Sequence, residues 1–196
     1  MGFFVFLLLL GAFLFLYGVS IYNWFVKAKT RITASIQEIG NQLKRQADLV
    51  PNLVSSVKGY MKHEKDIFKE ITDARKSALS ALKDGQLEKL VDAGSRLDKA
   101  LAPIRAVFES TPQLKAAEPT VKLMDELRDT ADKLMYSRRT LIDLVADYNT
   151  KRIAFPSSIL ATMFGFGKQE GLKTPETGAH VEVSSAEMKS PKVELN

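Results

Sequence analysis

The N-terminal end of this chain restricts the possible folds more than any other part of it. No side chain in residues 2–26 is charged, and residues 3–19 (FFVFLLLLGAFLFLYGV) are almost wholly apolar. A helix of about 20 residues crosses the hydrocarbon core of a bilayer, and a single segment in lipid satisfies its own backbone only as a helix. The sequence therefore predicts a transmembrane anchor over residues 1–26. Its marker residues are Phe3, Leu10, Gly11, Gly18 and Val19.

A cleaved signal peptide is the alternative interpretation of this stretch. No Lys or Arg precedes the apolar run, no Ala-x-Ala site follows it, and Tyr22 and Trp24 stand where an interfacial aromatic belt is expected. We therefore expect the anchor to be retained. The chain has no cysteine, which excludes lipoprotein acylation, disulfides and thiolate chemistry.

Charge on the two sides of the anchor predicts its orientation. Lys27, Lys29 and Arg31 follow the apolar run, and an excess of Lys and Arg marks the cytoplasmic side. The soluble part is therefore expected in the cytoplasm. The chain carries a net charge of +5, and residues 27–75 hold ten basic and six acidic side chains. Attraction to anionic lipid headgroups explains this surplus more simply than nucleic acid does.

The region from Ile32 to Arg152 has the periodicity of helices. Its apolar residues recur at steps of three and four, without the alternation of strands, in four stripes that begin at Ile32, Leu53, Leu87 and Met124. Short connections between such stripes favour antiparallel neighbours. We predict an all-α fold in which an antiparallel up-and-down four-helix bundle occupies residues 27–154.

Three local signals predict the helix boundaries. Asp84 and Gly85 form a good C-cap and turn, and Pro103 is expected to kink or split the third helix. Around Pro51 two outcomes are open: Asp48 caps a new helix with Pro51 in its first turn, or Pro51 kinks one long rod. We favour the new helix.

The segment 155–167 is apolar, aromatic and uncharged, but too short to span a membrane. An even number of antiparallel helices returns the chain to the bilayer here, so we predict an interfacial or partner-facing segment. The alternative is that it folds back on the end of the bundle. Residues 168–196 are polar and are expected to form a disordered tail. The interaction residues are Phe155, Pro156, Ile159, Leu160, Phe164, Gly165 and Phe166.

Residues with catalytic or metal-binding chemistry are sparse. His63 and Glu64 begin a zincin-like motif, but Ile67 stands where the second His is required. The chain also lacks a nucleophile elbow, a phosphate-binding loop and basic patches with interleaved aromatic residues. We expect no catalytic residues, no metal, no cofactor and no nucleic-acid partner.

Two charged residues interrupt the apolar stripes. Heptad counting places Glu64 on the second stripe and Arg138 on the fourth. If these two helices pack side by side, the carboxylate and the guanidinium form a buried ion pair, because an unpaired buried charge costs several kcal/mol. The alternative is that helix rotation brings one or both to solvent.

Several sequence blocks resemble the LemA family. The blocks are QLKRQADLVPNLV (42–54), VKGY (57–60), HE (63–64), TPQLKA (111–116), FP (155–156) and FGF (164–166), with Tyr-Asn pairs at 22–23 and 148–149. The chain departs from the usual pattern at residues 131–134 (ADKL) and 141–142 (LI). The resemblance implies a bacterial membrane protein with one N-terminal span and a helical bundle, and it brings no established reaction.

We therefore expect a non-enzymatic, membrane-anchored helical scaffold at the bacterial inner membrane. It is expected to contact lipids, to form homo-oligomers and to bind other proteins. Gly11 and Gly18, on one side of the anchor, would allow two anchors to approach closely. The alternatives are an accessory factor or enzyme in envelope or lipid metabolism, and a membrane stress-signalling component.

Overall fold

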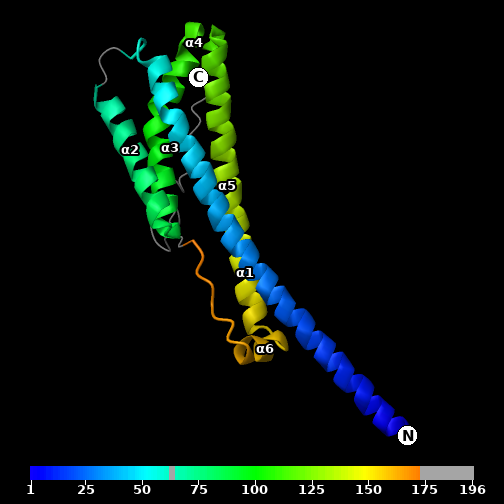
Figure 1. The fold of residues 1–196 in the computed structure, drawn as a ribbon. Helices are drawn as coiled ribbons and strands as arrows, with labels where there is room; N and C mark the ends of the chain where they lie inside the picture. Colours follow the sequence, from blue (N-terminus) through cyan, green and yellow to red (C-terminus); the bar gives the residue numbers. More distant parts are fainter. Residues whose placement is uncertain (62–64, 173–196) are drawn as a thin grey trace, which may run out of the picture.

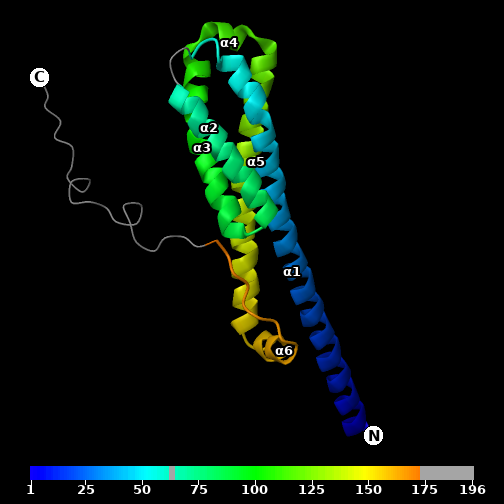
Figure 2. The same ribbon diagram turned by 60° about the vertical axis from the view of Figure 1, so that its left-hand side comes forward.

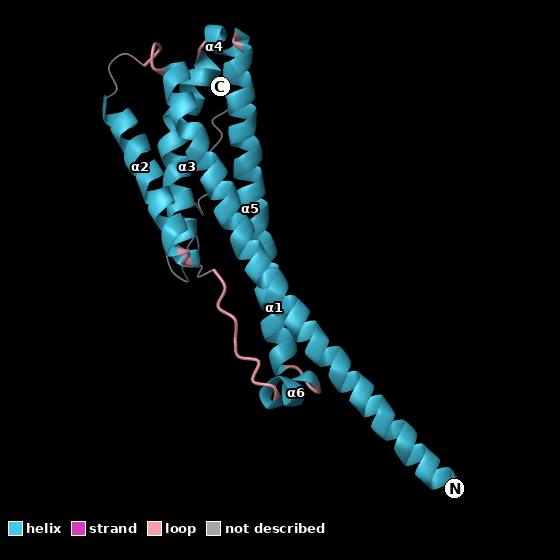
Figure 3. Cartoon of the chain, in the orientation of Figure 1, coloured by secondary structure: helices cyan, strands magenta, loops and turns pink. Residues whose placement is uncertain are grey.

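The computed structural model describes residues 1–61 and 65–172 as an all-α molecule without strands in those ranges (Figures 1 and 3). The predicted fold class is confirmed. The six helices are α1 (Gly2–Val57), α2 (Lys65–Asp84), α3 (Leu87–Ser110), α4 (Pro112–Ala116), α5 (Glu118–Ile153) and α6 (Ser157–Met163).

Helix α1 combines the apolar N-terminal stretch and the first predicted stripe in one continuous rod. The side chains of residues 1–16 are exposed, whereas from Ile21 onward a side chain at about every third or fourth position is buried, among them Phe25 and Ala28. Within the described residues, it is the one helix long and apolar enough to cross a membrane, with a mean hydropathy of 2.5 over its best window. The free end of α1 projects well away from the other helices (Figure 1).

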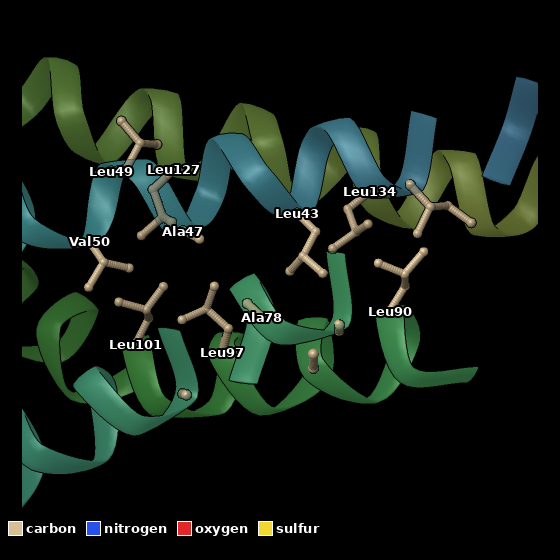
Figure 4. Packing of buried hydrophobic residues seen from close by; sticks show 14 of the residues in the cluster. Leu43, Ala47, Leu49, Val50, Ala78, Leu90, Leu97, Leu101, Leu127 and Leu134 are labelled. Atoms are coloured by element: carbon tan, nitrogen blue, oxygen red, sulfur yellow. The ribbon is translucent and has the colours of Figure 1, made fainter. Parts of the chain in front are cut away.

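Helices α1, α2, α3 and α5 lie alongside one another and run in alternating directions, with α4 at the end far from the N-terminus (Figures 1 and 2). Helix α5 packs along α1, whereas α2 packs against α3 and α1. Leucine and alanine side chains fill the space between them, among them Leu43, Ala78, Leu97 and Leu127 (Figure 4). The arrangement is therefore an α1–α5 pair and an α2–α3 pair, and α1 contacts both helices of the second pair.

Pro51 does not start a new helix, and the prediction that it does is wrong. It lies inside α1, where it removes the N–H that would bond the carbonyl of Ala47. Arg75 of α2 replaces that donor, because its Nε donates to the Ala47 carbonyl oxygen at 2.9 Å. The freed carbonyl is thus satisfied by a residue from another helix, and α1 continues to Val57.

Other boundaries follow the local signals in part. Gly85 has a φ of +66° and ends α2 as expected, and its N–H donates to the Ala81 carbonyl. Helix α3 runs through Pro103 without the split that was one of the two expected outcomes. The second apolar stripe, which begins at Leu53, is divided between two helices, because α1 ends at Val57 and α2 begins at Lys65. The chain therefore changes direction after Val57 rather than at Pro51.

Candidate functional site

Two regions concentrate side chains with functional potential: the end of the α1–α5 pair nearest the apolar stretch, which we call the base, and a groove between α3 and α5. The base is built on aromatic rings. Phe25 of α1 is fully buried, its ring stacks on Phe166 at a centroid distance of 4.8 Å, and it meets Tyr148 of α5 edge-on at 5.3 Å. Tyr22 contacts Phe164 and Phe166 at 5.1 and 5.6 Å. These contacts hold the segment after α5 against α1.

Polar contacts fix the chain that follows. Asn149 Nδ2 donates to the Gln169 carbonyl at 2.9 Å, and the Gln169 N–H donates to Asn149 Oδ1 at 3.0 Å. Burial raises the pKa of the adjacent Tyr148, while its hydrogen bond with Gln169 opposes this shift. Residues 168–172, assigned from the sequence to a disordered tail, instead lie along α5; residues 173–196 lie outside the described part of the chain.

Helix α6 has an inner and an outer face. Leu160 and Phe164 line a cavity of about 410 Å³ shared with Leu14 and Gly18 of α1. On the outer side, Ile159 and the preceding Phe155 are 60% and 83% exposed, whereas Met163, 64% exposed, borders the cavity. The turns around the helix use Pro156 as its N-cap and Gly165 with a φ of +68°. The predicted interaction segment thus both folds back on α1 and presents apolar side chains outward.

Basic side chains surround the base. Lys151 Nζ lies 4.6 Å from the centroid of the Trp24 ring, and Lys151 and Arg152 occupy the last turn of α5. Lys27, Lys29 and Arg31 are exposed on α1 just beyond the aromatic rings. A cationic band therefore borders the apolar surface.

The groove between α3 and α5 encloses about 620 Å³, with Gln46 of α1 among its lining residues. Its lining carries Lys99, Arg105, Arg128 and Arg138 against Asp98, Glu109 and Asp132. Asp98 forms an ion pair with Arg105, part of the α3 wall. Among the described residues, no group of three or more His, Asp or Glu is placed to hold a metal ion.

Arg138, predicted to pair with Glu64, faces α3 in this groove. Its Nη2 donates to the Val91 carbonyl at 3.0 Å, and Gly94 makes room for it: an added Cβ there would stand 2.6 Å from Nη2. Burial lowers the pKa of Arg138, opposed by the charges of Asp98 and then Asp92. Glu64 lies outside the described residues, so the ion pair stays a prediction.

Gln46 is the residue that sequence reasoning missed. It is 1% exposed, and neither its amide nitrogen nor its amide oxygen has a hydrogen-bond partner within the described structure. The signal was available: Ile39, Leu43 and Val50 mark the buried stripe of α1, and Gln46 occupies one of its positions. Counting only charged interruptions of the stripes left this neutral one out.

Three of the short blocks noted in the sequence meet at the base through ring contacts: Tyr22, Tyr148 with Asn149, and the 164–166 block. A fourth, Phe155 with Pro156, precedes α6. The LemA family model matches residues 35–185. The magnetosome protein MamQ of Magnetospirillum gryphiswaldense is 24% identical over 172 residues, an alignment that covers 76% of this chain and 63% of that protein. The chain therefore spans less than two-thirds of the length of this relative.

Proposed function

The chain belongs to the LemA family, and on this premise we propose that it is a membrane-anchored helical interaction protein without catalytic activity, whose base sits in the membrane interface. The observation that carries the proposal is the position of α6. This helix packs beside residues 14–22 of α1, at the end of the apolar stretch, and leaves Ile159 and the preceding Phe155 exposed.

The surroundings of α6 are those of an interfacial segment. Aromatic side chains such as Trp24 favour the headgroup level, and exposed apolar residues there enter the acyl boundary. The nearby cations Lys27 and Lys151 match anionic headgroups. Lipid contact by the base therefore accounts for both the apolar and the basic surface.

Retention and orientation of the anchor form part of the proposal. Cleavage after the apolar run would remove Leu14 and Gly18, which form one wall of the α1–α6 cavity. The basic residues that follow the run favour a cytoplasmic location for the helices, at a bacterial inner membrane. Carbonate extraction should leave a full-length chain in the membrane fraction. Recovery of a shortened soluble chain contradicts retention, and a C-terminal reporter active only in the periplasm contradicts the orientation.

Quenching by brominated lipids tests the position of α6 directly. Trp24 is the single tryptophan, so Trp24→Phe gives a silent background. In that background we expect Ile159→Trp fluorescence to be strongly quenched in bilayers with brominated acyl chains. The matched control is Tyr136→Trp, at a site on α5 that is 72% exposed and outside the base. Equal quenching of the two probes, or none at residue 159, contradicts the proposal.

Self-association is the interaction that we propose first. The outward apolar side chains of α6 and the single anchor are better buried against copies than left exposed. Protein purified in detergent is expected to exceed the monomer mass, and Ile159→Asp is expected to lower that mass, whereas Tyr136→Asp leaves it unchanged. A monomer in every case contradicts the scaffold role, even if the lipid contact is found.

A further inference from the structure

We propose that the groove between α3 and α5 binds a small carboxylate that also carries an amide, such as an acylated amino acid. The proposal concerns a region separate from the base and does not depend on the lipid contact. It starts from a cavity of about 620 Å³ whose lining includes Gln46 and Arg138. Cavities of this size accommodate ordinary small-molecule ligands.

The buried amide of Gln46 is the first element of the site. A buried polar group without a hydrogen bond costs about 1–3 kcal/mol in proteins, so such groups normally have partners. Gln46 is 1% exposed, and both Nε2 and Oε1 are unpartnered within the described residues. One donor and one acceptor at adjacent atoms match a second amide, which offers the complementary pair.

Arg138 is the second element. Its Nη2 is held by the Val91 carbonyl, whereas its Nε has no hydrogen-bond partner among the described residues. Gly94 lets the guanidinium lie close to α3, which fixes its position. A planar guanidinium with an unpartnered N–H forms a short, charge-assisted hydrogen bond with a carboxylate.

The other residues that line the groove indicate whether the ligand is a compact inorganic anion or a molecule with both polar and apolar groups. Asp98 is engaged by Arg105, and the lining as a whole carries four basic side chains against the three acidic ones Asp98, Glu109 and Asp132. Leu127, Leu134 and Met124 of α5 supply apolar surface in the same cavity. The combination of a basic surplus that includes Arg138, the amide of Gln46 and an apolar wall favours a ligand with a carboxylate, an amide and an aliphatic side chain over a compact inorganic anion.

Three probes test this chemistry on the full-length protein in detergent. N-Acetyl-L-leucine carries all three groups, N-acetyl-L-leucinamide lacks the charge, and 4-methylpentanoate lacks the amide. Binding is followed by calorimetry and by NMR of the Gln46 side-chain amide. We expect N-acetyl-L-leucine to bind at least about tenfold more tightly than either of the others, a factor typical of one lost charge-assisted or buried hydrogen bond.

Variants separate the two polar contacts. Arg138→Met is expected to weaken N-acetyl-L-leucine at least about tenfold, while Arg139→Met, the neighbouring exposed arginine outside the groove, leaves binding unchanged. Gln46→Leu is expected to abolish the preference for N-acetyl-L-leucine over 4-methylpentanoate. If Arg138→Met fails to fold, Arg138→Lys, which keeps the charge but lacks the Nε–H, replaces it.

Three results would overturn the proposal. The first is no binding of N-acetyl-L-leucine to the wild-type protein at about 10 mM, a concentration that detects even dissociation constants in the millimolar range. The second is equal binding of the charged and the neutral probe. The third is binding that persists undiminished when Arg138 or Gln46 is replaced.

Discussion

The base and the groove use polar and apolar groups in opposite ways. At the base, Phe25 and Tyr148 are almost fully buried against other rings, and Asn149 exchanges two hydrogen bonds with the backbone of Gln169. In the groove, the amide of Gln46 is as deeply buried but has no partner in the described structure. The amide of Asn149 at the base is thus satisfied within the protein, whereas the amide of Gln46 in the groove is not. This contrast indicates that the base is held by its own aromatic and amide contacts, whereas in the groove the amide of Gln46 lacks a partner, which the proposed ligand would supply.

Two neighbouring residues of α1 show the same contrast at closer range. The carbonyl of Ala47, freed by Pro51, accepts a hydrogen bond from Arg75. The side chain of Gln46 has no such partner. Satisfying a buried polar group therefore depends on whether a neighbouring helix supplies a donor at that place, and α2 supplies one where α3 and α5 do not.

The largest effect is expected from removing the central ring of the base. Phe25→Ala should lower the free energy of unfolding by about 3–5 kcal/mol, because it leaves a cavity between Tyr148 and Phe166. Denaturant unfolding of the detergent-solubilised protein measures this change. Tyr136→Ala, at an exposed site on α5, is the control and should change the value by less than about 0.5 kcal/mol. Similar losses in both variants would show that the base is no better packed than the surface.

The second-largest loss of stability is expected when Arg75 is replaced. Arg75→Met leaves the Ala47 carbonyl without its donor and is expected to cost about 1–3 kcal/mol. In a Pro51→Ala background the restored backbone N–H bonds that carbonyl, so the same substitution should cost less. A double-mutant cycle measures the coupling between the two positions. If the stability changes of the two single variants simply add in the double variant, Arg75 does not compensate for Pro51. Lys76→Met, on the same helix as Arg75, is the control.

Asn149 should have a smaller and more local effect. Asn149→Ala removes both hydrogen bonds to Gln169 and is expected to cost about 1–2 kcal/mol. Faster amide hydrogen exchange in residues 167–172 is the specific readout, with Thr150→Ala as the control. Unchanged exchange there would mean that the aromatic contacts alone hold this segment.

Gln46→Leu is expected to have the smallest effect and the opposite sign. Leucine has no unpartnered polar atoms, so the ligand-free protein should become more stable by about 1 kcal/mol. Thermal unfolding measures the shift, with Gln37→Leu, at an exposed glutamine of the same helix, as the control. A destabilised Gln46→Leu variant would show that the amide is satisfied, and the contrast between base and groove would fail.

Local patterns determined the fold class and the outline of the chain. The charge-free N-terminal run and the three-and-four spacing of apolar residues predict helices wherever they occur, because helix periodicity is a property of neighbouring positions. The same holds for the turn at Gly85, which requires a φ that glycine adopts readily. The blocks that resemble the LemA family likewise lie in the sequence itself, and the family match over residues 35–185 confirms that prediction.

Tertiary structure decided the features that depend on residues far apart in the chain. Pro51 breaks a helix by local rules, but Arg75, which lies 28 positions after Ala47, satisfies the Ala47 carbonyl that the proline frees. Gln46, Gly94 and Arg138 come from three different helices, so no window of sequence places them in one groove. Phe166 meets Phe25 only because α5 runs antiparallel to α1 and returns the chain to the base. Hydrogen bonds and ring contacts form between atoms that are close in space, and sequence spacing records that closeness only within a single helix.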